Sequence, residues 1–491
     1  MKPMSSSAHD ERSPAERVLR KLRDRLRDLR LDSLDALRVE EEIREGLDML
    51  GRELMSELFA RADVDDQEVK INGVLHGRVD RHRAKIHTSF GVVEVDRSVY
   101  RHSRHGPTVA PLDKIVGIVE GFYTPKCAKI LCRLSALLVR DDMEAVAHDF
   151  GGLGVGSATM HRLPQAVMAR YEERRDLVER TVRDRSVVPP GAVTMQIGLD
   201  GVMVPQEGEH CRPRGRTTND DPAPPRHELK YGDATDVGPA ANDHSAGRAW
   251  HEASVATLTF YDVEGTHLAT TYIGRMPEEG KASLATMLEE EALHALASRP
   301  DLTPVLASDG APFQWKLLEA MRRRMPEPAQ QNACELLDFF HAAENLQEAC
   351  DAIDGEGTAA ASVRRAGWAE TLKAYDDGVV RVLQALRYQR RIATRPFVRK
   401  EIDKVIGYLR NNQHRMAYRQ AIARCLPIGT GATEAAAKSL VGVRMKRSGA
   451  RFSQHGGQTI LSLLAAHKSD RFDDLMNVLG STYKATVKRA A

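Results

Sequence analysis

Three acidic residues in different local settings could together support metal-dependent chemistry. Asp200 lies in the apolar stretch TMQIGLDGVMVP, Asp309 ends a second apolar stretch, LTPVLASDG, and Glu434 lies near the start of a predicted helix. Carboxylates are the ligands that Mg²⁺ prefers, and two ions about 3.5–4 Å apart can activate an attacking water or 3′-hydroxyl and stabilise the leaving oxygen. The pattern therefore predicts phosphodiester chemistry with two divalent ions, Mg²⁺ or Mn²⁺, held by Asp200, Asp309 and Glu434.

Each aspartate taken alone is a weak signal, because Asp-Gly pairs are common in turns. Gly201 and Gly310 directly follow the two aspartates, and a glycine allows a backbone to approach a substrate closely. The prediction depends on the combination of two apolar strands that both reach Asp-Gly with a distant helix that begins near a glutamate.

Asp338 and His341 form a secondary candidate, a D-x-x-H pattern at the end of a predicted strand over 333–340. The histidine could move a proton or contact the scissile phosphate. An equally good interpretation is a helix-capping aspartate followed by a packed histidine.

Two groups of cations are candidates for contact with the DNA backbone. Residues 379–424 contain twelve Lys or Arg and two acids, and residues 444–491 contain nine and three. Clustered like charge of this kind suits a phosphate-facing surface, although a solvated helix face gives the same pattern. The residues predicted to contact DNA are Lys438, Arg444, Lys446, Arg447 and Arg451 after Glu434, and Arg390, Arg391, Arg399 and Lys400 in the earlier group.

Residues 125–176 have the outline of a helix-turn-helix, in which a glycine-rich stretch separates two helical segments. In that arrangement Thr159, His161 and Arg162 would face a DNA groove. An ordinary pair of antiparallel helices remains the alternative.

Composition narrows the class of protein without naming a partner. The chain has 491 residues, enough for two to four domains, and 71 basic against 69 acidic residues leave a net charge of only +2. Six irregularly spaced cysteines form no CxxC pair, which indicates a reducing compartment. No apolar run approaches eighteen residues and no signal peptide is recognisable, so we expect a soluble cytoplasmic protein.

The order of predicted elements after Pro189–Pro190 is three strands, a helix, a strand, a helix, a strand, a helical insertion and final helices. This order matches the ribonuclease-H-like (RNase-H-like) arrangement, an α/β fold with a mixed sheet and helices on both faces. The predicted segments are an N-terminal helical segment (1–66), a basic β-hairpin (67–110), a helical, helix-turn-helix-like DNA-binding region (111–188), the first part of the catalytic domain (189–355, with a flexible insertion at 206–248), a basic helical insertion (356–428) and C-terminal catalytic helices (429–491).

Six segments within residues 193–478 resemble the DDE transposases of bacterial insertion sequences, specifically the ISKra group. They are IGLDGVMV, YDVEGTHLATTYIGRMPEEGK, LASDGAPF, DFFHAAENL, GTGATEAAAKSLVGVRMKRSGARFS and HGGQTILSLLAAHKSDRFDDL. The resemblance implies an RNase-H-like catalytic domain, Asp200, Asp309 and Glu434 as the metal-binding triad, and a helical insertion before Glu434. It further implies binding of double-stranded DNA at element ends and target, and a homo-oligomer in the bacterial cytoplasm.

Other functions remain open on the sequence. A simpler RNase-H-like nuclease, such as a junction resolvase, would not need the basic helical insertion. A catalytically silent or domesticated DNA-binding regulator would be expected to have lost part of the triad, yet all three acids are present. A carboxylate-pair hydrolase such as a glycosidase is disfavoured by an aromatic content of 5%, since sugar sites use aromatic stacking.

Overall fold

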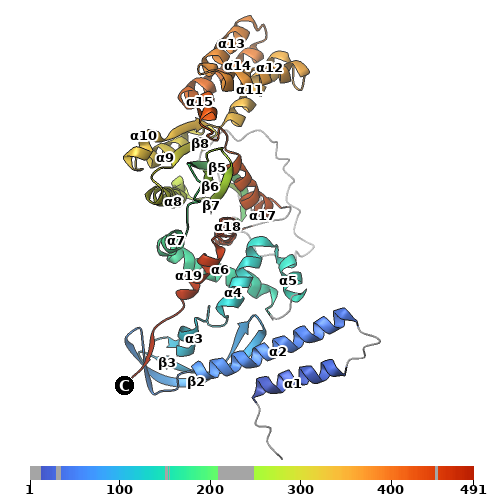
Figure 1. Cartoon of the computed structure of the whole chain (residues 1–491), viewed down its shortest axis with the longest axis vertical. Coiled ribbons are helices and arrows are strands. Elements are labelled where there is room, and N and C mark those ends of the chain that lie inside the picture. The colour runs from blue at the N-terminus through green and yellow to red at the C-terminus, as the bar shows by residue number, and fades with distance from the viewer. Residues whose placement is uncertain are drawn as a thin grey trace, which may run out of the picture. The chain divides into compact units, whose positions relative to one another are not determined.

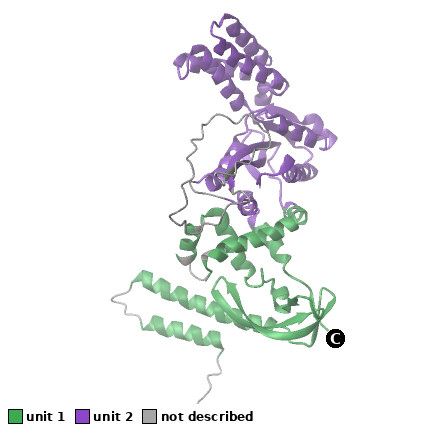
Figure 2. Cartoon of the chain, turned by 180° about the vertical axis from the view of Figure 1, so that it is seen from behind, with its two compact units in different colours: residues 1–182, 473–491 green, residues 183–472 purple. Residues whose placement is uncertain are grey.

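The computed structural model describes residues 13–28, 35–149, 153, 155–207, 248–447 and 452–490. The chain divides into two compact units, one made of residues 1–182 and 473–491 and the other of residues 183–472 (Figure 2). In these described ranges, no helix combines the length and the apolar character that a membrane-spanning helix needs.

The second unit is built on a five-stranded sheet with the spatial order β7-β6-β5-β8-β9. Its strands are β5 (Thr194–Glu207), β6 (Arg248–Tyr261), β7 (His267–Arg275), β8 (Thr303–Ser308) and β9 (Cys334–Leu337). β6 pairs antiparallel with both of its neighbours, whereas β5, β8 and β9 pair in parallel. The predicted α/β class is confirmed, and the strands follow the predicted order.

Helices cover both faces of this sheet (Figure 1). One face packs its apolar side chains, including Ile197 and Leu199 of β5, against α8 (Ala282–Ser298) and α9 (Pro312–Arg322). The other face packs against α16 (Gly431–Ala436), the π-helical turn Ala437–Gly442 and α18 (Gln454–Lys468). Since side chains alternate along a strand, Asp200 shares the face of β5 that α16 covers.

The connection between β5 and β6 coincides with the predicted insertion at 206–248. The two strands stay paired out to Glu207 opposite Arg248, so they are neighbours in the sheet as expected. Residues 208–247 lie outside the described part of the chain.

The predicted helical insertion lies between β9 and α16 and has a hydrophobic core of its own. Leu346, Leu372, Leu386 and Ile402 contribute to that core from four successive helices. The helices are α11 (Phe339–Asp354), α12 (Ala359–Ala374), α13 (Gly378–Ile392) and α14 (Pro396–Asn412), followed by the short α15 (Tyr418–Ala423) (Figure 1).

The first unit combines helices with a second sheet, ordered β10-β1-β2-β3-β4. The predicted basic hairpin is present as β2 (Val74–Thr88) and β3 (Gly91–Arg101). The remaining elements are α1 (Pro14–Arg27), α2 (Ala36–Ala62), β1 (Glu68–Ile71), β4 (Thr108–Val109), α3 (Pro111–Val116), α4 (Pro125–Leu137), α5 (Arg140–Asp149), α6 (Ser157–Glu173), α7 (Arg175–Arg183), α19 (Phe472–Ser481) and β10 (Val487–Arg489).

The C-terminal residues differ from the prediction that all of 429–491 forms helices of the catalytic domain. β10 pairs antiparallel with β1, and residues 473–491 belong to the first unit. Val487 packs beside Val69 and Tyr100 in a small core. A three-residue strand is too short to show a period in sequence, and its partner lies more than 400 residues away, so no local pattern could have predicted this pairing.

Candidate active site

Asp200 lies on β5, and Asp309 directly follows β8, the adjacent parallel strand of the second unit. The parallel pairing of β5 with β8 ends with Gly198 opposite Ala307. Asp200 comes two residues after Gly198 on β5, and Asp309 comes two residues after Ala307, just past the end of β8, so an extension of the register sets these residues opposite each other. In open α/β sheets this edge, at the carboxyl ends of parallel strands, is where ligands gather.

The turn after β8 holds Asp309 in a defined orientation. Its Oδ1 accepts hydrogen bonds from the Ser308 hydroxyl at 3.3 Å and from the Ala311 amide at 3.0 Å. Gly310 has a φ of 101°, a conformation that side chains disfavour. The Tyr408 hydroxyl of α14 donates to the Asp309 carbonyl at 3.0 Å, and burial raises the pKa of Tyr408, which keeps it a neutral donor. The insertion is thereby tied to the turn that carries Asp309.

Glu434 reaches this edge because α16 crosses β5 at a glycine. A Cβ added at Gly198 would overlap the hydroxyl of Thr433 and would lie 3.2 Å from that of Thr257. The two threonine hydroxyls are themselves hydrogen-bonded at 2.7 Å. Gly198 and Asp200 share one face of β5, so the helix that presses on Gly198 brings Glu434 to the side of the strand that carries Asp200.

We expect the Gly198→Ala substitution to lower any activity of this site by about a hundredfold, because α16 must move outward and displacements of about 1 Å can have that effect. The Thr433→Ala change in the same chain should restore part of the activity, since it removes the atom that the new methyl overlaps. Gly367→Ala is a matched control, because its added Cβ meets no atom within 4 Å. Full activity of Gly198→Ala in an assay of the metal-dependent phosphodiester cleavage that the sequence predicts would show that this close approach does not position Glu434.

Asp338 is a buried cap rather than an open ligand. It is 0% exposed, and its Oδ1 accepts from the amides of Phe340 at 2.6 Å and His341 at 3.1 Å, which are in the first turn of α11. Its Oδ2 accepts from the Thr430 amide at 2.6 Å and from the Thr430 hydroxyl. Four donors use the acceptor capacity of a carboxylate, so the capping interpretation of Asp338 is favoured over a catalytic one.

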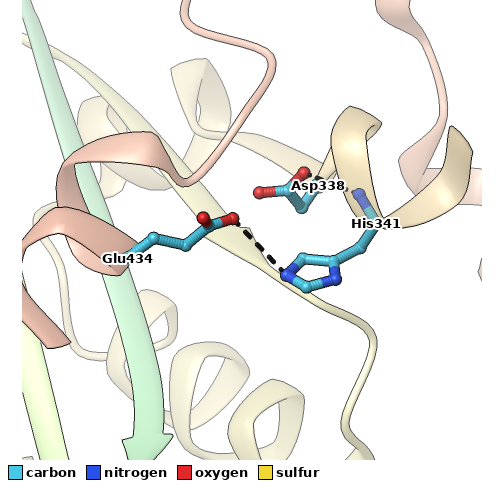
Figure 3. Close-up of side chains that lie close together, drawn as sticks. All are labelled: Asp338, His341 and Glu434. Atoms are coloured by element: carbon cyan, nitrogen blue, oxygen red, sulfur yellow. Dashed lines mark hydrogen bonds and ion pairs between the residues drawn. The ribbon is translucent and has the colours of Figure 1, made fainter. Parts of the chain in front are cut away.

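His341 points towards Glu434 from the start of α11 (Figure 3). Its Nε2 is 3.6 Å from Glu434 Oε1, and its Nδ1 is 3.0 Å from Glu344 Oε2. Lys438 places its ammonium 3.7 Å from the other oxygen of Glu434 and is 81% exposed. His341 and Lys438 thus flank the two oxygens of Glu434.

Among the described residues, the group of acidic and histidine side chains whose ligand atoms all lie within 4.8 Å of one another is Asp338, His341 and Glu434. The predicted set of Asp200, Asp309 and Glu434 is not gathered this tightly. Because Asp338 is already saturated by four donors, we do not assign a metal ion to the tighter group. Two ions about 3.5–4 Å apart also do not require three carboxylates within one coordination sphere.

Burial and the two other carboxylates of the predicted triad both affect Asp200. The pKa of Asp200 is raised above its ordinary value, mainly by burial and further by the carboxylates of Asp309 and Glu434. A hydrogen bond from the Gly201 amide at 2.7 Å and the nearby His341 act in the opposite direction. Such a concentration of negative charge destabilises the empty site and favours a bound divalent cation. Hard oxygen donors from three side chains fit Mg²⁺ or Mn²⁺.

With metal removed by EDTA, we expect Asp200→Asn to be more stable than the wild type at pH 7, by on the order of 1 kcal/mol. The raised pKa means that the folded protein binds more protons than the unfolded chain between the ordinary pKa of about 3.9 and the raised one, so the wild type loses stability as pH rises through that window. The advantage of the variant should therefore vanish at pH values below the window, and saturating Mg²⁺ should reverse it at pH 7.

Urea unfolding followed by tryptophan fluorescence measures the stability difference between the wild type and Asp200→Asn in the second unit. All three tryptophans, Trp250, Trp315 and Trp368, belong to the second unit. A wild type that is as stable as Asp200→Asn at every pH in EDTA would contradict the raised pKa of Asp200.

The predicted DNA contacts have different surroundings. Arg444 is only 7% exposed, which argues against a direct contact with DNA. Arg451 lies outside the described residues, and Thr159 is half-buried on α6. The predicted cations and histidine that lie exposed at the surface are Lys438, Lys446, Arg447, Arg390, Arg391, Arg399, Lys400, His161 and Arg162.

Two residues that position Glu434 were not singled out from sequence. Gln196, on the same face of β5 as Asp200, donates to the Gly429 carbonyl at 2.8 Å and accepts from the Tyr261 hydroxyl at 3.0 Å. Gly198 accommodates α16 as described above. An isolated glycine inside a strand is a known sign of close backbone approach, so Gly198 could have been noticed, whereas Gln196 carries no such signal.

The chain matches no protein-family model, and it has no significant match among curated proteins.

Proposed function

We propose that this protein is a DDE transposase that binds the terminal inverted repeats of a DNA element, hydrolyses phosphodiester bonds at the element ends and joins the freed 3′-hydroxyl to target DNA. The observation that carries the proposal is the β5–β8 register, which sets Asp200 opposite Asp309, together with the α16–Gly198 contact that brings Glu434 to the same face.

The topology of the sheet supports an RNase-H-like assignment of the second unit. β6 alone runs against the other four strands, β5 is central, and helices cover both faces. A long helical block separates β9 from the helix with Glu434. The resemblance of the sequence to DDE transposases also implies an RNase-H-like domain with a helical insertion before Glu434.

Asp200, Asp309 and Glu434 would hold two Mg²⁺ or Mn²⁺ ions, which supply activation of the nucleophile and stabilisation of the leaving oxygen when bound. The residues of the chain supply position. The Asp309 turn and the Gly198–Thr433 contact orient two of the three carboxylates. His341, beside Glu434, can donate a hydrogen bond to a non-bridging phosphate oxygen or carry a proton away.

Exposed cations provide a path for the DNA backbone. Lys438 lies one turn after Glu434, Lys446 and Arg447 follow, and the insertion adds Arg391, Arg399 and Lys400. The helix pair α5–α6, with His161 and Arg162 exposed, is a candidate reader of the element end. A homo-oligomer would supply one active site to each end of the element.

Cleavage of a labelled duplex that carries the element's own terminal repeat tests the proposal. We expect nicking at the repeat boundary with Mg²⁺ or Mn²⁺, none in EDTA, and a product with a 3′-hydroxyl that a polymerase can extend. Cleavage that persists in EDTA would overturn the two-metal mechanism. Binding of the repeat without cleavage under any metal condition would favour the regulatory DNA-binding function instead.

A further inference from the structure

One end of the α13–α14 pair carries an exposed group of cations and apolar side chains that the active site does not use. The two helices pack against each other and are joined by residues 393–395 (Figure 1). The segment 387–400 contains six Lys or Arg and no acid. We call this segment the α13–α14 tip; its cations are Arg387, Arg390, Arg391, Arg395, Arg399 and Lys400.

The apolar side chains of the tip are exposed to an unusual degree. Tyr388 is 52% exposed, Ile392 is 51% exposed and Phe397 is 63% exposed. Tyr388 and Ile392 are one turn apart on α13, and Phe397 is in the first turn of α14. Several large apolar side chains exposed within one short segment indicate a binding surface more often than single exposed residues do. The guanidinium of Arg391 lies 5.4 Å from the centre of the Tyr388 ring, so a cation already accompanies the aromatic face.

The charge of the tip is largely uncompensated. Arg390 pairs with Asp403 of α14, and in the described part of the chain no acid is paired with Arg391 or Lys400. This excess of positive charge favours a polyanion over a second copy of the same surface, which would repel it.

We propose that the α13–α14 tip binds unpaired nucleotides of a DNA strand, with the bases stacked on Tyr388 and Phe397 and the phosphates held by the surrounding cations. A duplex exposes phosphate and sugar on its outside and hides the flat faces of its bases. Cations alone are enough to bind the phosphates on the outside of a duplex. Exposed aromatic rings can stack on bases only where the bases are unpaired and unstacked.

The distance from the tip to the scissile phosphate rests on the proposed function, which places that phosphate at Asp309. Phe397 and Tyr408 lie on one face of α14, and Tyr408 bonds to Asp309. Eleven residues of helix span about 16 Å. At about 3.4 Å for each base pair of intervening duplex, the tip would meet the DNA about five base pairs from the scissile phosphate. Lys400 and Lys404 lie along the intervening stretch of α14.

Fluorescence anisotropy of labelled oligonucleotides tests this inference in EDTA, where no metal-dependent cleavage interferes. The probes are an oligo-dT of about 20 nucleotides, a duplex of equal length and the same duplex with a short mismatched stretch. We expect the Tyr388→Ala, Phe397→Ala double variant to bind oligo-dT and the mismatched duplex at least about tenfold more weakly while its binding to the paired duplex is unchanged. Val363→Ala, which alters an exposed apolar residue of α12, is the matched control and should bind all three probes as the wild type does.

Two further measurements separate the alternatives. Arg399→Gln with Lys400→Gln should weaken binding to every probe and reduce its dependence on salt, because these residues contact phosphate. Equal loss of paired and unpaired probes in the aromatic variant would overturn base stacking. Loss of self-association in sedimentation, with unchanged binding of oligo-dT, would identify the tip as a protein interface. Failure of the proposed cleavage with intact discrimination between probes would reject the transposase and leave the stacking site.

Discussion

Replacing Asp309 by asparagine, or Glu434 by glutamine, is expected to reduce metal-dependent cleavage by at least about a thousandfold while DNA binding is retained. Each substitution keeps the shape of the side chain and removes the charge that would hold a divalent ion. Both residues lie at the surface of the site with intermediate exposure, so neither change should unfold the protein. Single-turnover cleavage of the terminal-repeat duplex measures the loss, and anisotropy measures binding.

The double variant of Asp309 and Glu434 provides a stricter test than either single variant. Carboxylates that act as one unit should make the double variant scarcely worse than either single variant. Glu344→Gln is the matched control, because Glu344 is a nearby carboxylate that contacts His341 and is 70% exposed. We expect that change to alter the rate by less than about fivefold. A triad variant that cleaves as fast as the Glu344→Gln control would refute the assignment.

The Asp338→Ala substitution should have the largest effect on stability, a loss of about 3–5 kcal/mol from the free energy of unfolding of the second unit. It leaves the amides of Phe340, His341 and Thr430 and one hydroxyl without their acceptor in a fully buried place. Urea unfolding followed by tryptophan fluorescence reports on this unit, since all three tryptophans lie in it.

Asp338 binds both the first turn of α11 and Thr430, and two other variants distinguish this arrangement from ordinary helix capping. Thr358→Ala removes the cap of α12, in which the hydroxyl accepts from the Ala361 amide at 3.1 Å and donates to the Gly355 carbonyl at 3.0 Å, and should cost only about 1 kcal/mol. Asp338→Asn should fall between the two, because its amide can accept from α11 but would face the Thr430 amide donor with a nitrogen. If Asp338→Ala costs no more than Thr358→Ala, the link between α11 and the Thr430 turn is not important to stability.

Local sequence patterns predicted part of the candidate site. The apolar stretches that contain Asp200 and Asp309 were enough to predict two buried strands, and the turn and helix signals around them indicated the order of the later elements along the chain. These patterns reflect preferences of neighbouring residues, which a single sequence displays directly. They left the role of Asp338 open between catalysis and capping.

Long-range contacts settled what local patterns left open. Thr430 is 92 residues from Asp338, and its two donors complete the saturation of that carboxylate. The same applies to the 2.7 Å bond between Thr257 and Thr433, and to the pairing of β10 with β1. None of these partners has a fixed spacing along the chain, so no periodic signal could reveal them.

The sequence alone determined the chemical types of the candidate residues, the mixed α/β class and the order of the strands along the chain. These features follow from side-chain period and turn chemistry, which are local properties. The register of β5 against β8, the passage of α16 over Gly198 and the burial of Asp338 and Arg444 follow only from tertiary packing. Packing decides them because each depends on the free energy of joining segments that are remote in sequence, where shape and hydrogen-bond partners must match in three dimensions.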